Sequence, residues 1–135
     1  MSMMNKNFLA KCAAILVAAV CVPVVQAIEF DEVRDFNDVF VLSAVAPAPD
    51  RLEVRWDIED GFYLYNNKFL TFTSGTEGVV LGKPEVPPGK RGFDDLLGEE
   101  VEKYYHELVV NIPLVSVAPG VNTLELKVRS QGCME

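Results

Sequence analysis

The residue whose chemistry stands out is Cys133, which lies two positions before the end of the sequence. The other two cysteines, Cys12 and Cys21, lie in an apolar leader, so Cys133 is the one thiol expected in the folded part. In an exported protein, a single thiol indicates a reactive group or a cysteine that pairs with another molecule. A leftover residue near a disordered end is the competing interpretation, and the cysteine count does not separate the two.

Groups suited to metal binding or hydrolysis are sparse. His106 is the only histidine, and no second Cys or His stands at metal-ligand spacing. No serine has the glycine-flanked setting of a nucleophile elbow. We therefore expect no metal and no cofactor. We interpret His106, within "YYHELVV", as an ordinary strand residue on the face opposite Tyr105 and Glu107.

Five carboxylates precede this histidine and raise the question of calcium: Asp94, Asp95, Glu99, Glu100 and Glu102. A calcium loop spaces its Asp and Asn ligands around a glycine, and this run lacks that spacing. The pattern therefore favours a solvated charge run.

The first 27 residues have the organisation of a secretory leader. Lys6 and Lys11 supply a positive start, residues 13–22 are apolar, and Val25-Gln26-Ala27 offers the small residues that a signal peptidase accepts. We expect cleavage after Ala27, which leaves residues 28–135 as the mature chain. An uncleaved anchor over residues 10–25 and lipidation of Cys21 are the alternatives.

The charge and length of the mature chain limit its possible partners and its number of domains. Without Lys6 and Lys11 it holds 10 basic residues against all 20 acidic ones, a net charge of −10. Nucleic acids and anionic membranes bind through Lys and Arg, so this charge argues against both as partners. Residues 28–135 are enough for one domain with a hydrophobic core and too few for two.

Apolar residues recur with a period of two over short runs, which is typical of antiparallel strands. The clearest run is residues 51–58, "RLEVRWDI", which we expect to pair with residues 38–46 across the "PAPD" turn. Further strands are expected over residues 62–74, 106–117 and 122–128. The pattern predicts an all-β, immunoglobulin-like antiparallel β-sandwich. Six residues are expected in its core: Leu52, Val54, Trp56, Leu124, Leu126 and Val128.

Two stretches interrupt this regularity. Residues 75–105 are rich in Gly, Pro and acidic residues, and we expect a long working loop with one short strand inside it. Residues 29–40, "EFDEVRDFNDVF", fit either an extended segment or one helical turn.

Three segments together resemble the N-terminal periplasmic domain of the thiol:disulfide interchange protein DsbD. They are "WDIEDGFYLYNNKF", "FDDLLGEEVEKYYHELVVNIPL" and "LELKVRSQGC", in this order, and the resemblance runs from about Phe30 to the end. It implies an immunoglobulin-like sandwich in the periplasm. It also implies a role in relaying electrons by thiol–disulfide exchange. The implied source is a membrane reductase, namely the membrane and C-terminal domains of a DsbD-like protein. The implied recipients are thioredoxin-like disulfide isomerases and a cytochrome-maturation thiol reductase.

The resemblance also implies roles for single residues. Cys133 matches the first cysteine of the family's pair, and the second would follow within several residues, before a final strand. We therefore expect a chain cut between the two cysteines, with an unpaired sheet edge. Such a domain would form a mixed disulfide but would be inactive alone as a protein-disulfide reductase. A non-catalytic or vestigial immunoglobulin-like binding module is the alternative.

The family's active site has an aromatic wall and a cap loop, and both have counterparts here. Tyr63 and Tyr65 match the wall, while the cap loop matches Asp94, Asp95, Leu96, Leu97 and Gly98. Carboxylates close to a thiol disfavour its thiolate, so a closed cap would hold Cys133 unreactive. Leu96 and Leu97 stand where the family has an aromatic tip, so shielding here would depend on aliphatic side chains.

Overall fold

The computed structural model describes residues 34–66 and 68–135, so the predicted leader and its cleavage site lie outside the described residues. The elements are α1 (Phe36–Val39), β1 (Phe40–Ala48), β2 (Arg51–Ile58), β3 (Phe62–Asn66), β4 (Thr71–Ser74), β5 (Val79–Leu81), β6 (Lys90–Asp94), β7 (Glu99–Tyr104), β8 (Glu107–Val117), β9 (Leu126–Arg129) and β10 (Gly132–Met134). No helix within the described residues is long and apolar enough to span a membrane.

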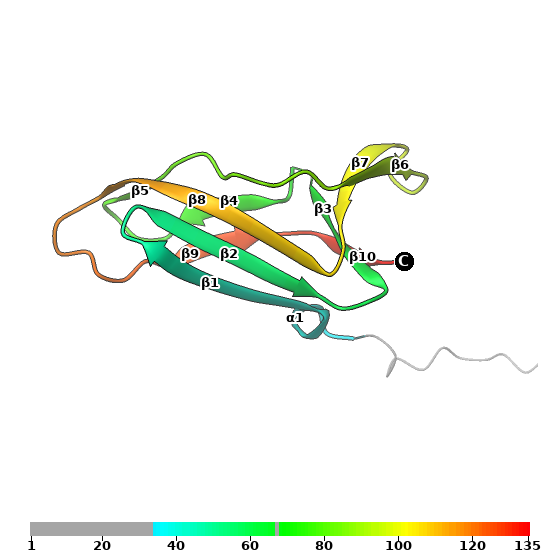
Figure 1. Ribbon diagram of the computed structural model, residues 1–135, viewed down its shortest axis with the longest axis horizontal. Coiled ribbons are helices and arrows are strands. Elements are labelled where there is room, and N and C mark those ends of the chain that lie inside the picture. The colour runs from blue at the N-terminus through cyan, green and yellow to red at the C-terminus, as the bar shows by residue number, and fades with distance from the viewer. Residues whose placement is uncertain (1–33, 67) are drawn as a thin grey trace, which may run out of the picture. The chain divides into compact units, whose positions relative to one another are not determined.

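The strands form three antiparallel sheets, with the orders β1-β2-β8-β5, β10-β3-β7-β6 and β4-β9 (Figure 1). The main core cluster combines residues of the first sheet with Leu64 and Tyr104 of the second, and Phe72 and Val128 of the third pack against it. This arrangement confirms the predicted antiparallel, immunoglobulin-like β-sandwich.

The hairpin predicted around residue 50 is confirmed. β1 pairs with β2 from Phe40 opposite Ile58 to Ala48 opposite Arg51, and the register shifts between Val45 and Ala48. β1 runs through Pro47, whereas the sequence led us to end the strand before it. Proline is compatible with this position because β1 lies at the edge of its sheet, where one side of the ladder needs no N–H donor.

The predicted core is confirmed in part. Leu52, Val54 and Trp56 are buried, and the Trp56 ring meets Phe72 edge-on with centroids 6.0 Å apart. The other three residues, Leu124, Leu126 and Val128, are only half-buried and pack against the cluster from its margin. β9 also begins later than predicted, at Leu126. No strand among the described residues pairs with the other edge of β9, so that edge is open.

Three local predictions were wrong. Residues 62–74 form two strands, β3 and β4, instead of one. Residues 75–105 hold β5, β6 and β7, so the expected loop with one short strand is mostly sheet. His106 is not a strand residue: it lies in the tight turn between β7 and β8 with φ 64°, and its exposed ring contacts Asp60 at 2.9 Å.

The question left open near the N-terminus is answered for its described part. Residues Phe36–Val39 form one helical turn, and Asp35 caps it because the side-chain carboxylate accepts the Asn37 N–H at 2.8 Å. The turn leads directly into β1, so Phe40 enters the core at its first strand position.

The second sheet has two differently used faces. Leu64 and Tyr104 point into the main core, whereas their neighbours in sequence face the other way. A second cluster on that outer face consists of Tyr63, Tyr65 and Val101, with Tyr105 and Cys133 packed against it. We call these five residues the thiol cluster.

Candidate functional site

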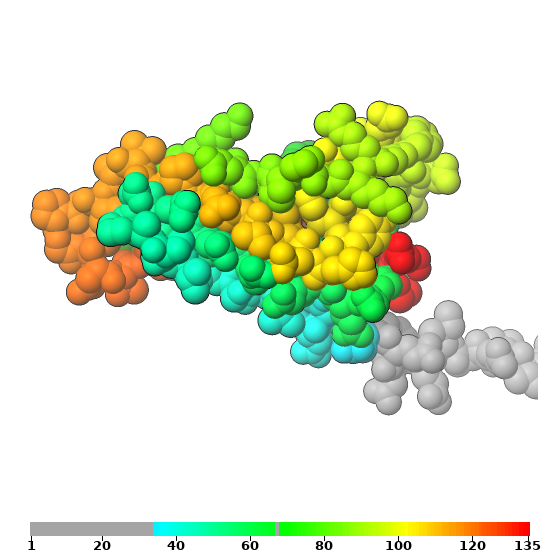
Figure 2. All heavy atoms as spheres, in the orientation of Figure 1, coloured from blue at the N-terminus to red at the C-terminus, as the bar shows by residue number. Residues whose placement is uncertain are grey.

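Cys133 lies in the middle of β10, a three-residue strand that pairs with β3. Its register partner is Tyr63, so the thiol and the phenol share the outer face of the sheet. The thiol is free and half-buried. The C-terminal segment lies at the surface, at the same end of the domain as the β6–β7 hairpin (Figure 2).

The glycine before this cysteine has a packing role. A Cβ atom at Gly132 would lie 2.3 Å from Cζ of Phe40, which is closer than real contacts allow. Phe40 is buried, and its ring packs against Phe36 and Phe62. The absence of a side chain therefore lets β10 lie flat against the core and presents Cys133 on the opposite face.

Two phenols in edge-to-face contact connect the thiol to the β6–β7 hairpin. The Tyr63 and Tyr65 rings meet edge-on with centroids 5.1 Å apart, and their hydroxyl oxygens are 3.0 Å apart. Cys133 packs against the cluster that contains Tyr63. Burial raises the pKa of Tyr63, and the Cys133 sulfur adds to that rise. Burial also raises the pKa of Tyr65, whose hydroxyl is bonded to Tyr63 and Asp94. Both phenols are therefore protonated at neutral pH.

The Asp94 carboxylate joins these phenols to the cap loop, residues 94–98. Its Oδ2 atom accepts the Tyr65 hydroxyl at 3.0 Å and lies 2.7 Å from Nζ of Lys103. Its Oδ1 atom accepts the backbone N–H groups of Leu96 and Leu97, each at 3.0 Å. Lys103, with the Leu97 N–H and the Tyr65 hydroxyl, lowers the pKa of Asp94 to about 2. Asp94 is therefore ionised in the folded protein.

The interpretation of the acidic run as solvated is wrong for Asp94, which is 5% exposed. It fits Asp95, Glu99 and Glu100, which are exposed. Glu102 is half-buried and accepts bonds from Asn66 and Arg91, which lower its pKa. No group of three or more His, Cys, Asp or Glu side chains in residues 34–66 and 68–135 has the geometry to hold a metal ion.

Of the predicted cap residues, Asp94 contacts the thiol cluster through Tyr65, and the others are exposed or close the loop. Asp95 is exposed, and Leu96 and Leu97 are 83% and 42% exposed. Gly98 closes the loop with φ 70°, and its N–H donates to the Asp94 carbonyl at 2.7 Å. The contact between cap and phenols is thus made by a carboxylate rather than by the leucine tip.

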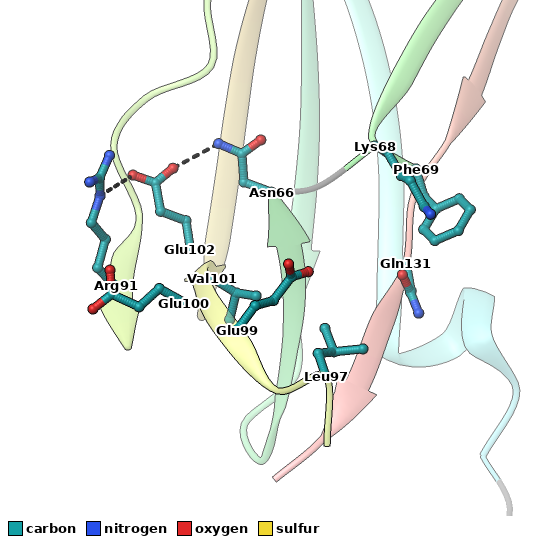
Figure 3. A pocket seen from close by; sticks show the side chains of 10 residues that line it. All are labelled: Asn66, Lys68, Phe69, Arg91, Leu97, Glu99, Glu100, Val101, Glu102 and Gln131. Atoms are coloured by element: carbon teal, nitrogen blue, oxygen red, sulfur yellow. Dashed lines mark hydrogen bonds and ion pairs between the residues drawn. The ribbon is translucent and has the colours of Figure 1, made fainter. Parts of the chain in front are cut away.

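A cleft of about 670 Å³ adjoins the cap and the segment that leads to Cys133. Leu97 and Gln131 lie across it from Asn66, where Glu102 bridges Asn66 and Arg91 (Figure 3). Lys68 and Phe69 form a further part of its wall.

Sequence reasoning missed Lys103 and Tyr105. Both share the outer face with Val101, and Lys103 lies 4.2 Å above the Tyr63 ring. The alternation of Val101, Lys103 and Tyr105 in "EEVEKYY" was the available signal. It was overlooked because the segment was assigned to a loop.

The hydrogen bonds between Tyr63, Tyr65 and Asp94 have a defined donor and acceptor at each step. An ionised carboxylate only accepts, so the single Tyr65 proton points to Asp94, and the Tyr65 oxygen is free to accept from Tyr63. The Tyr63 oxygen can then accept the S–H proton of Cys133. If the thiol ionises, Tyr63 can turn its proton to the sulfur, which matches the direction of its pKa shift. The site thus places a hydroxyl that can donate or accept a hydrogen bond beside the Cys133 sulfur.

Comparison with known proteins identifies relatives of this chain. The family described as "Thiol:disulfide interchange protein DsbD, N-terminal" matches residues 31–135. The DsbD protein of Ralstonia nicotianae is 31% identical over 121 residues, which cover 90% of this chain and 19% of that protein. That of Pseudoalteromonas atlantica is 36% identical over 86 residues, which cover 64% of this chain and 14% of the relative. The chain thus spans less than a fifth of these curated relatives.

Solved structures agree with the sequence matches. The reduced DsbD N-terminal domain of Neisseria meningitidis superposes with a TM-score of 0.64 at 25% identity, covering 77% of this chain and 78% of that one. A complex between the DsbD and PilB N-terminal domains of the same species gives a TM-score of 0.59 at 28% identity, with 77% of each chain covered. From the family match over most of its length, we conclude that this chain belongs to the DsbD N-terminal domain family.

Proposed function

We propose that this chain is a periplasmic thiol–disulfide exchange domain whose reacting group is Cys133. The observation that carries the proposal is the position of the half-buried Cys133 thiol, which packs beside Tyr63, the first of two phenols linked by hydrogen bonds to Asp94. A cysteine without function would need no such polar surroundings.

The proposed chemical step is a disulfide exchange. The Cys133 thiol loses its proton to solvent, and the thiolate attacks one sulfur of a partner's disulfide. A new S–S bond forms between Cys133 and that sulfur, while the partner's own S–S bond breaks and its second sulfur leaves as a thiolate. Release of the partner in its reduced form then needs a second thiol to attack Cys133. Within the described residues, Cys133 is the free cysteine. The second thiol therefore comes from outside them.

The partners follow from the family. We propose that the domain receives electrons from the membrane and C-terminal domains of a DsbD-like protein. It would pass them to thioredoxin-like disulfide isomerases and cytochrome-maturation reductases of the periplasm. The solved complex of a related DsbD domain with the PilB N-terminal domain supports binding to another protein. Export would follow removal of residues 1–27, giving a mature chain that begins at Ile28.

Exchange with a small disulfide tests the reactivity of the thiol. The exported chain is incubated with oxidised glutathione and followed by intact mass, with Cys133→Ser as the control. The expected result is one glutathione per chain, absent from the control. An isomerase-reduction assay on the same sample should show no turnover, because no second thiol is available to resolve the adduct.

The outcomes separate the two candidate functions. Adduct formation by the folded chain supports the exchange domain. A thiol that reacts only after unfolding in urea would contradict it and would favour the non-catalytic binding module. The same measurement gives the N-terminal residue, because a retained leader adds the mass of residues 1–27.

A further inference from the structure

Lys103 is a charged residue of β7 that lies largely buried against the thiol cluster. Its side chain is 20% exposed, and its ammonium lies 2.7 Å from the Asp94 carboxylate, whose side chain is 5% exposed. The same Nζ atom lies 4.2 Å from the ring centre of Tyr63 and 5.5 Å from that of Tyr65. Burying an ion pair costs desolvation energy that offsets much of the attraction, so the gain in stability is by itself a weak reason for this pair.

The pair holds the cap loop to the thiol cluster. The Asp94 atom that meets Lys103 also accepts the Tyr65 hydroxyl, and the other carboxylate oxygen accepts the N–H groups of Leu96 and Leu97. One carboxylate therefore ties the cap backbone to the phenols. Its charge is compensated by Lys103, which comes from the opposite strand of the hairpin.

We propose that Lys103 is a positioning residue that latches the cap loop onto the thiol cluster and so controls access to Cys133; the functional meaning of this latch rests on the exchange function proposed above. Without the ammonium, Asp94 is a buried and uncompensated charge. The carboxylate then gains by moving into water. The backbone of Leu96 and Leu97 moves with it, because both N–H groups are bonded to the same side chain.

The position of the cap connects this latch to the thiol. Leu97 lines the same cleft as Gln131, which lies two residues before Cys133 (Figure 3). Tyr63 is the register partner of Cys133, and it carries Lys103 on its ring face. Release of Lys103 and Asp94 therefore uncovers the phenol that packs beside the sulfur.

The test measures the latch and the thiol separately. In the full chain, amide hydrogen exchange of Leu96 and Leu97 reports the cap, and the rate of Cys133 alkylation by iodoacetamide reports access. Lys103→Met should speed both by on the order of tenfold. Lys103→Arg, which keeps the charge, should stay close to the wild type. The double variant Asp94→Asn with Lys103→Met should also stay close, because a neutral amide can remain buried and still bind the cap.

A matched control removes a neighbouring charge. Lys90 is the register partner of Lys103 and lies 5.4 Å above the Tyr105 ring, but it is exposed. Lys90→Met should leave both rates within about twofold of the wild type, as is usual for surface changes. Amides of β8 report whether each variant keeps its fold.

The results decide the proposal whatever happens to the exchange function. If amide hydrogen exchange of Leu96 and Leu97 is unchanged in Lys103→Met, the proposal is overturned. It is also overturned if this exchange becomes faster while the rate of Cys133 alkylation stays the same. If Lys103→Met unfolds, the double variant Asp94→Asn with Lys103→Met decides. Fast amide exchange of Leu96 and Leu97 in the folded double variant also overturns the proposal. Failure of the wild type to form any mixed disulfide would contradict the exchange function while leaving the amide result intact.

Discussion

The substitution Gly132→Ala tests how β10 presents the thiol. The new Cβ atom would lie 2.3 Å from Cζ of Phe40 and 2.8 Å from both Cε atoms. The ring has little room to move, since Phe40 is 3% exposed and its centroid is 4.5 Å from that of Phe36 and 5.9 Å from that of Phe62. Either the ring shifts within the core or β10 leaves β3.

The magnitude follows from the cost of overpacking, about 1–3 kcal/mol for a filled core site. With a urea dependence of about 1–3 kcal/mol per M for a small domain, the unfolding midpoint should fall by roughly 1 M. If β10 detaches instead, the midpoint changes less and Cys133 loses the cover of Tyr63. We therefore expect a lower midpoint, faster alkylation of Cys133 by iodoacetamide, or both.

Two further variants sharpen this experiment. Gly92→Ala is the matched control, because a Cβ atom there meets no heavy atom within 4 Å, and both readouts should match the wild type. Adding Phe40→Leu to Gly132→Ala shortens the opposing side chain and should restore slow alkylation. If Gly132→Ala alters neither the midpoint nor the alkylation rate, the packing argument for β10 is wrong.

Three other predictions concern the core and the buried titrating groups. Trp56→Ala should lower the free energy of unfolding by about 3–5 kcal/mol, measured by urea titration, since the side chain is 1% exposed; a near-neutral effect would contradict its place in the core. The pKa of Asp94 is lowered to about 2, so its contribution to stability is present above the ordinary carboxyl value of 3.8 and is lost as the pH falls toward 2. The urea midpoint of Asp94→Asn should therefore depend less on pH across this range. A midpoint that falls as steeply as in the wild type would count against the buried carboxylate. Burial raises the pKa of Tyr104 to about 12, so its contribution to stability is present below the ordinary value of 10.0 and is lost as the pH rises toward 12. Phenol absorbance should show one late-titrating phenol fewer in Tyr104→Phe, with those of Tyr63 and Tyr65 remaining, and an unchanged late amplitude would contradict the burial of Tyr104.

The sequence predicted those parts of the fold that apolar alternation controls. β2 and β8 carry regular apolar positions, and Leu52, Val54 and Trp56 proved to be buried. β6 and β7 were missed because residues 90–94 and 99–104 are mostly charged or small, so the few buried positions among them give no regular apolar alternation. Gly and Pro residues before them also favoured a loop.

The candidate site was predictable where a motif marks it and not where it depends on distant pairing. Cys133, Tyr63 and Asp94 were singled out from the sequence, and the structure brings them into one network. The burial of Asp94 depends on Lys103, and this contact exists only once the hairpin has formed. Single-sequence patterns gave no reason to separate Asp94 from the exposed carboxylates that follow it.

The turn at His106 illustrates the same limit. A positive φ at a non-glycine residue is uncommon, so alternation naturally placed His106 in a strand. The turn forms because β7 and β8 belong to different sheets, and the chain must cross between them within two residues.

Capture of a mixed disulfide tests the central claim most directly, that Cys133 exchanges disulfides with a protein partner. The exported chain is mixed with an oxidised periplasmic thioredoxin-like protein from the same organism, quenched with acid and analysed by non-reducing intact mass. The account predicts a species with the summed mass of the two proteins, joined through Cys133, cleaved by dithiothreitol and absent from Cys133→Ser. A folded chain whose Cys133 reacts with iodoacetamide but yields no such species would contradict the account.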